Sequence, residues 1–266
     1  MALTATYDPV LSRLQLAGTS LGASATYAVF DRTTDGGITY TVVRGGTAVP
    51  VSSQNAALDD YEFPTGISIT YRVRSYNASN VLQQTFTVAK TQDVDDVWLK
   101  VPAAPFLNMP VTVSFAGDKT KPARGGVFEI VGRSVPVAIT DIRSSAGFDV
   151  RIRTFTKAEE QALDYLLSSG EIVFFQLPSD NDCMDGGYYF AGDATWGPPS
   201  SRARPERIFT IPLRGCAAPG PDVIASAYTW TNVLADYATW TTLLAANATW
   251  SALLAHTGTP SDILVP

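Results

Sequence analysis

The chain has 266 residues, of which 45% are hydrophobic and 17% charged, so it can form roughly two domains with a normal core and is not intrinsically disordered. Its formal net charge is −6 without a basic block, which disfavours nucleic-acid binding because such proteins neutralise phosphates with a basic surface. No apolar run approaches about 18 residues, so we expect no membrane insertion, and the residues that follow Met1 do not resemble a signal peptide.

Residues 1–90 contain short runs with the two-residue alternation of β-strands. The clearest run is residues 67–76, in which Ile69, Tyr71 and Val73 share one face. The tripeptide Asp35-Gly36-Gly37 predicts a hairpin turn, because glycine accepts the positive φ that such a turn requires. Further strands are expected at residues 11–16, 27–32, 38–44, 48–51 and 81–88, with a polar loop after residue 51 and a corner at residues 60–66.

About seven strands at spacings of roughly 8 to 12 residues predict a β-sandwich of the immunoglobulin type for residues 1–90. Residues 70–78 resemble the penultimate strand of fibronectin type III domains. The polar, acidic residues 90–96 mark an expected domain boundary, and the second domain is predicted at residues 97–216.

The second domain is expected to begin with strands at residues 97–101 and 111–115, separated by a Pro-rich segment and followed by an exposed loop at residues 117–126. The stretch 125–178 then gives the strongest local signals, and we expect it to form the core of this domain. It contains apolar runs at residues 127–131 and 135–139, a strand at 148–155, a helix at 157–169 and an apolar strand at 172–177.

The predicted helix has both start and stop signals. Thr156 and Glu159 fit a capping box in which the glutamate reaches back to the Thr156 amide, and Gly170 ends the helix. The residues expected to face the core are Ala162, Leu163, Leu166 and Leu167, and those expected to face water are Glu160, Gln161 and Asp164. After an acidic loop at residues 180–187, further strands are expected at 188–191 and 207–213.

Residues 222–266 are expected to form a C-terminal extension built from a ten-residue repeat, in which each Thr-Trp pair is followed by Leu and Ala. A continuous helix would turn the motif by about 80° per copy, so three short helices, each capped by Thr, fit better. Each copy is too short to bury its apolar side chains alone and needs a neighbour. The candidate interface residues are Trp230, Trp240, Trp250, Leu234, Leu244 and Leu254.

The sequence offers no convincing catalytic, cofactor-binding or metal-binding residues, and we expect that the protein is not an enzyme. The only histidine, His256, lies in the last repeat, and no nucleophile-elbow, Walker or dinucleotide-binding motif is present. Glu159 and Glu160 are adjacent on one helix and so point about 100° apart. The spacing of Asp180, Asp182 and Asp185 is not that of an EF-hand, and a solvated turn is favoured over a calcium site.

The two cysteines, Cys183 and Cys216, cannot form a four-ligand zinc site with one histidine. Without a secretion signal we expect two reduced, partly buried thiols, and one disulfide is the alternative. Trp98 and Trp196 are expected in the core. The Trp repeat also permits a sugar-binding platform, but the leucines that follow each Trp favour packing.

Three features in this order resemble the minor tail proteins of long-tailed bacteriophages, particularly those that infect actinobacteria. They are the fibronectin-like module, the block 126–175 and the Thr-Trp repeats. Block 126–175 looks like the β-barrel-plus-helix domain of distal tail and tail-hub proteins. The resemblance implies a mainly β structural protein of the virion, assembled in the host cytoplasm, that forms a trimeric or hexameric ring at the tail tip and docks other tail proteins.

Two other classes of function remain open. A carbohydrate-binding module would use the sandwich and the Trp residues to adhere to the host cell wall, and glycan binding by the isolated protein would favour it. A hydrolase with an unrecognised site would turn over a peptidoglycan or ester substrate and lose that activity in a single carboxylate or serine variant.

Overall fold

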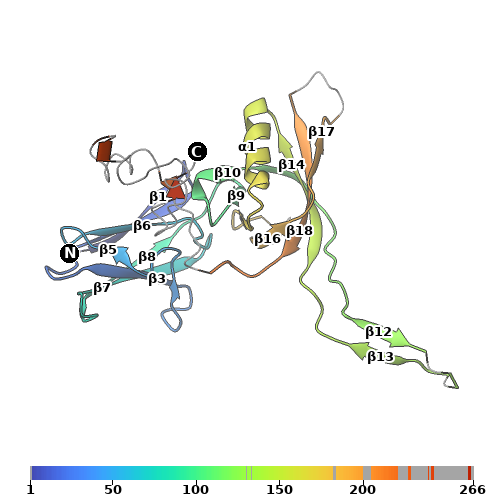
Figure 1. The fold of residues 1–266 in the computed structure, drawn as a ribbon, viewed down its shortest axis with the longest axis horizontal. Helices are drawn as coiled ribbons and strands as arrows, with labels where there is room; N and C mark the ends of the chain where they lie inside the picture. Colours follow the sequence, from blue (N-terminus) through green and yellow to red (C-terminus); the bar gives the residue numbers. More distant parts are fainter. Residues whose placement is uncertain are drawn as a thin grey trace. The chain divides into compact units, whose positions relative to one another are not determined.

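The computed structural model describes residues 2–129, 131–132, 134–181, 184–199, 205–220, 227–228, 239, 241–242 and 263–264 (Figure 1). It is mainly β, with several antiparallel sheets. Unit 1 comprises Met1–Pro110, Gln176–Asn181 and Pro219–Pro266, and unit 2 comprises Val111–Phe175 and Asp182–Ala218. This division differs from the predicted domains at residues 1–90, 97–216 and 222–266, because the chain leaves unit 1 and returns to it twice.

Two antiparallel sheets build the first part of unit 1. The three-stranded sheet has the order β1 (Ala2–Asp8), β2 (Arg13–Thr19) and β6 (Ala56–Asp60). The other has the order β4 (Thr41–Val42), β3 (Tyr27–Thr33), β7 (Ser68–Tyr76) and β8 (Leu82–Thr91), and β5 (Val49–Pro50) also pairs with β3. The remaining elements of unit 1 are β9 (Trp98–Lys100), the 3-10 helix η1 (Pro105–Leu107), β10 (Met109–Pro110), and the parallel pair β19 (Ala227–Tyr228) and β20 (Ile263–Leu264).

The two larger sheets of unit 1 enclose one apolar cluster. Alternate residues of β7, among them Ile69, Tyr71 and Val73, are buried, as the sequence pattern predicts. Leu14 and Leu16 of β2 join the same cluster, and so does Trp98, which confirms the core position predicted for it. The core of unit 1 therefore extends beyond the predicted boundary at residues 90–96.

The hairpin turn predicted at Asp35-Gly36-Gly37 is wrong, because the segment after β3 forms a longer loop. The pairing of β3 with β4 begins only at Thr41, so residues 34–40 form a longer loop. The Asp35 carboxylate accepts hydrogen bonds from the backbone amides of Ile38 and Thr39, both at 3.0 Å, and a side chain thus organises the loop in place of a two-residue turn. The sequence prediction also missed β1 and assigned β6 to a polar loop.

A buried ion pair joins the two larger sheets of unit 1. Asp60 is 2% exposed and accepts hydrogen bonds from Arg32, from the Tyr71 hydroxyl at 2.8 Å and from the Glu62 amide at 2.9 Å. Burial by itself lowers the pKa of Arg32, but the adjacent Asp60 carboxylate raises it above its ordinary value. Burial, reinforced by Asp60, also raises the pKa of Tyr71.

Unit 2 is a sheet backed by a helix. Its strands lie in the order β15 (Val173–Gln176, whose last residue belongs to unit 1), β16 (Gly187–Ala191), β18 (Arg207–Gly215), β14 (Gly147–Thr154) and β11 (Thr112–Ala116), and β17 (Thr195–Gly197) pairs with β18. Phe148, Val150 and Ile152 of β14 are buried, as predicted. Among the described residues no pairing joins β11 to β15, so the sheet of unit 2 is open and the predicted barrel is not closed within it.

Helix α1 (Lys157–Ser168) packs against β14 and confirms the predicted start signal. The Thr156 hydroxyl accepts a hydrogen bond from the Glu159 backbone amide. Gly170, after the end of the helix, has the expected left-handed conformation, with φ of 68°. The Glu159 carboxylate, however, reaches the amide of Phe155 at 2.8 Å, not that of Thr156.

The predicted faces of α1 are partly wrong. Leu163 and Leu166 are buried as expected, but Ala162 is exposed. Glu160, predicted to face water, is 7% exposed and lies 2.9 Å from Lys157 and 3.7 Å from Arg207. The cationic partner at Arg207 comes from β18, so the helical pattern alone does not reveal it.

Candidate assembly surface

Unit 2 carries a long β-ribbon, residues 117–147, which we call the arm. Beyond the ends of β11 and β14 its two chains stay hydrogen-bonded: the Thr120 amide donates to Gly147, the Ser144 amide to Pro122 and the Asp141 amide to Arg124. The ribbon then continues as β12 (Gly125–Phe128) paired with β13 (Val137–Thr140). Figure 1 shows β12 and β13 at the far end of these two chains, away from the sheet of unit 2.

One face of the arm carries its largest apolar side chains, whereas the opposite face carries the smaller Val127 and Ala138. Opposed and alternating residues share a face, so Gly126 and Phe128 of β12 lie on the same side as Val137 and Ile139 of β13. The Phe128 ring lies over Gly126, where it is 3.1 Å from the position that a Cβ atom would take. Phe128 is 54% exposed and Ile139 is 62% exposed. We call Phe128, Val137 and Ile139 the apolar face of the arm.

Exposure of this face corrects the expectation that residues 125–139 are part of the domain core. An isolated two-stranded ribbon is at best marginally stable in water, and β12 and β13 pair only with each other among the described residues. Each therefore has an unpaired edge as well as exposed β-branched or aromatic side chains, a combination typical of interaction surfaces. A partner that covers the apolar face would bury these side chains, and a partner strand beside β12 or β13 would satisfy the unpaired edge.

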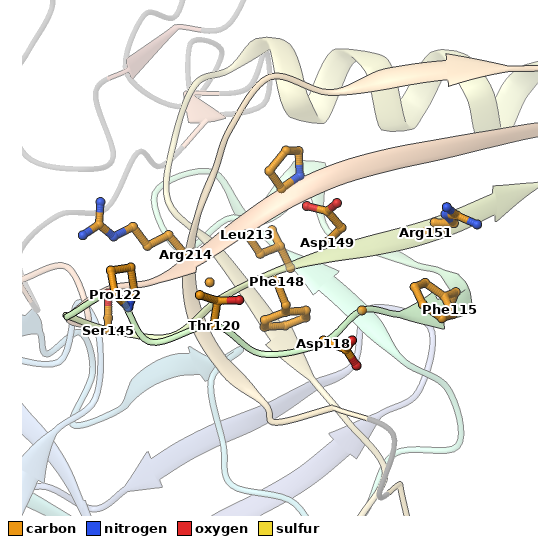
Figure 2. Close-up of a pocket in the computed structure, with 13 residues that line it drawn as sticks. Phe115, Asp118, Thr120, Pro122, Ser145, Phe148, Asp149, Arg151, Leu213 and Arg214 are labelled. Carbon is orange, nitrogen blue, oxygen red and sulfur yellow. The ribbon is translucent and has the colours of Figure 1, made fainter. Parts of the chain in front are cut away.

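A groove of about 590 Å³ lies at the base of the arm, where the start of β14 and the end of β18 meet residues 117–122 (Figure 2). Its lining combines apolar and charged side chains. The Arg151 guanidinium lies 5.1 Å from the centre of the half-exposed Phe115 ring. Arg214 donates a hydrogen bond to the Ser144 hydroxyl at 2.5 Å. The groove is suited to hold a mixed apolar and polar segment.

The structure does not bring the carboxylates of the predicted acidic loop, residues 180–187, together. Asp185 forms an ion pair with Lys119 at 2.5 Å, Asp180 is exposed, and Asp182 lies outside the described residues. Burial, reinforced by Asp185, raises the pKa of Tyr189, whose hydroxyl donates to the Asp185 carbonyl at 2.7 Å. In the described part of the chain no three His, Cys, Asp or Glu side chains are grouped as metal ligands would be.

All six candidate interface residues of the C-terminal repeats, Trp230, Trp240, Trp250, Leu234, Leu244 and Leu254, lie outside the described residues. In the second repeat, Thr239 and Thr242 exchange backbone-to-side-chain hydrogen bonds of 3.2 and 3.3 Å, which is the arrangement of a helix cap. Arg44 donates hydrogen bonds to the carbonyls of Pro219 and Gly220, so the chain that leads to the repeats is attached to unit 1.

The other residues considered for chemistry do not come together. Glu159 caps α1 and Glu160 is in ion pairs, while His256 and Cys183 lie outside the described residues. Cys216 is a free, exposed thiol, not a partly buried one. Trp196 stacks on Phe209, with ring centres 5.3 Å apart, but is 49% exposed and so is only partly a core residue.

Sequence reasoning missed the arm as a candidate site, although the signal was present: two apolar runs of β-branched residues flank Gly132 with few charges between them.

In the described residues no helix is both long and apolar enough to cross a membrane. A comparison with protein-family models and with curated proteins finds no match for this chain.

Proposed function

We propose that the chain is a structural virion protein of a phage tail tip, without enzymatic activity, that forms a ring by self-association and docks neighbouring tail proteins. The observation that carries the proposal is the exposed apolar face of the arm, Phe128, Val137 and Ile139. It lies on a two-stranded ribbon, which in isolation is at best marginally stable. A trimer or hexamer would cover this face on every copy, because a closed ring repeats one contact throughout.

A second contact is available at the edge of the sheet of unit 2. Strand β11 pairs with β14 on one side and, among the strands that the structure describes, is the last in that direction. An unpaired strand edge presents backbone donors and acceptors, and pairing with a neighbouring copy would satisfy them. On this proposal unit 2 corresponds to the tail-hub type of domain, and the barrel expected from the sequence would be completed by neighbouring copies.

Unit 1 fits the proposed fibronectin type III-like module. Its three-stranded sheet β1-β2-β6 and its sheet β4-β3-β7-β8 enclose one core, as the two sheets of such sandwiches do. In the proposed particle this module decorates the tail tip, and the Thr-Trp repeats dock a neighbouring tail protein. The net charge of −6 suits a virion component that must not adhere to nucleic acid.

The test compares two matched double variants of the full chain. Phe128→Ser with Ile139→Ser removes the apolar face, whereas Val127→Ser with Ala138→Ser changes the opposite face of the same ribbon. Full burial of one such large side chain contributes about 1.5–3 kcal/mol, so half-exposed Phe128 and Ile139 together account for roughly 3 kcal/mol of association. That is a loss of about a hundredfold in affinity per contact.

The measurement is sedimentation velocity over a range of protein concentrations, with far-ultraviolet circular dichroism as the check on folding. The proposal expects the first double variant to shift towards monomer while the control variant associates like the unaltered protein. Unchanged association of the first variant would contradict a role for the apolar face.

A further inference from the structure

Lys100, the last residue of β9, is buried inside unit 1, where a lysine is rarely found. It is 1% exposed, and its Nζ atom lies within hydrogen-bond distance of four oxygens: the Ser12 carbonyl and hydroxyl, the Tyr61 carbonyl at 2.8 Å and Oε1 of Gln176. All four residues belong to unit 1. Nothing in the proposed assembly role uses this cluster.

The carboxamide of Gln176 is held in a fixed orientation beside Nζ. Its Nε2 donates to the Phe63 carbonyl at 2.7 Å, and its Oε1 accepts the Ser12 hydroxyl at 3.0 Å. Ser12 Oγ is also 3.2 Å from Lys100 Nζ. The serine therefore bridges the amine and the carboxamide oxygen, which is the position of a group that passes a proton from one to the other.

The surroundings favour the uncharged, nucleophilic form of the amine. Ser12 is fully buried and Gln176 is 2% exposed, and the rings of Phe63 and Trp98 lie 5.5 and 5.7 Å from Nζ, so water is excluded. Burial lowers the pKa of Lys100 to about 7, although Asp60 and Glu62 oppose the shift. Nζ donates to Oε1 of Gln176, so the amine lies beside the carboxamide whose Cδ carries that oxygen. A neutral amine that keeps its two N–H bonds on the backbone carbonyls of Ser12 and Tyr61 can turn its lone pair towards this Cδ.

We propose that Lys100 and Gln176 form an intramolecular amide bond. The Nζ lone pair attacks Cδ of Gln176, and one Nζ proton passes through Ser12 Oγ to Oε1. When the tetrahedral intermediate collapses, the Oε1 proton moves to Nε2, the Cδ–Nε2 bond breaks and ammonia leaves. One amine and one primary amide thus give one secondary amide and one ammonia, without oxidant or cofactor.

Such a bond would close the chain around the first excursion into unit 2. Lys100 and Gln176 are 76 positions apart, and the residues between them include the whole of the segment Val111–Phe175. Covalent closure restricts the unfolded chain in the way that a disulfide does, but reduction does not reverse it. The inference concerns unit 1 and does not depend on the proposed role in a phage tail.

Denaturing mass spectrometry of the full chain tests the proposal. We expect a mass about 17 Da below that of the unlinked sequence, equal to the loss of one ammonia. Tryptic digestion should yield a branched peptide that joins Lys100 to Gln176. If the intact mass equals that of the sequence and both residues appear in linear peptides, the proposal is wrong.

Two substitutions separate this bond from other sources of ammonia loss. Lys100→Met should restore the full mass, whereas Lys90→Met, a lysine outside the cluster, should keep the deficit. A deficit that persists in Lys100→Met would overturn the assignment.

Ser12→Ala tests the proton relay in the same assay. This variant should be isolated partly unlinked and should then form the bond about tenfold faster at pH 8 than at pH 6, as expected of an amine with a pKa near 7. Complete linkage of Ser12→Ala at isolation would exclude the serine as the relay.

Discussion

The buried Asp60–Arg32 pair gives a quantitative prediction for the stability of unit 1. Arg32→Met removes the guanidinium and leaves a carboxylate that is 2% exposed and keeps, among the described residues, the Tyr71 hydroxyl and the Glu62 amide as partners. Breaking a buried ion pair by deleting one partner costs about 3–5 kcal/mol. With a urea m-value of roughly 2 kcal/mol per molar, the unfolding midpoint of unit 1 should fall by about 2 M.

Arg74→Met is the matched control. Arg74 lies 2.8 Å from the buried carboxylate of Asp31, but Arg72 already binds both oxygens of that carboxylate at 2.8 Å. Arg74 is also about a third exposed, so its loss should cost about 1 kcal/mol or less. Both variants are measured by urea unfolding. Hydrogen exchange of the β3 and β7 amides at each urea concentration reports on unit 1 separately from unit 2. Equal losses in the two would refute the account of the Asp60 pair.

Three further predictions concern other contacts. Leu166→Asp places an unpaired charge at a buried position of α1 and should unfold unit 2, which the loss of exchange protection in β14 would show; retained protection would mean that α1 is dispensable. Gly66→Ala should loosen residues 176–181 and speed their proteolysis, because the added Cβ would lie 2.3 Å from the Cβ of Ser179 at a φ of 71°; an unchanged cleavage rate would contradict this contact. Burial raises the pKa of Asp93, but hydrogen bonds from Ser179 and from the Val94 amide outweigh burial and lower the pKa. The Asp93–Ser179 contact therefore stabilises the fold above about pH 4 and is lost as pH falls further. Exchange of the Ser179 amide, corrected for its intrinsic rate, should therefore lose protection below that pH, and protection that does not change with pH would count against the contact.

The elements that the sequence predicts well are those with local signals. Helix α1 has a cap at Thr156 and a stop at Gly170, and β14 alternates strictly, so both follow from neighbours in the chain. Strand β6 is missed because four of its five residues, Ala56–Asp60, are alanine or aspartate, and pairing with β2 makes them a strand. The burial of Glu160 likewise depends on Arg207, which is distant in sequence.

The candidate site could be predicted only in part. Apolar β-branched runs such as those of the arm occur in buried strands and in interface strands alike. The pattern therefore predicts a strand, but it does not predict whether the same domain or a partner covers that strand. For Lys100 the hint was one lysine inside the apolar run of residues 97–101, but the oxygens that surround it come from Ser12, Tyr61 and Gln176. Only the tertiary fold brings these four residues together.

Self-association is the central claim, and the mass of the intact assembly tests it most directly. Native mass spectrometry of the full chain, at micromolar concentration and moderate salt, should give a closed trimer or hexamer of the 28.4 kDa subunit. A monomer at every concentration tested, with the arm intact, would contradict the account.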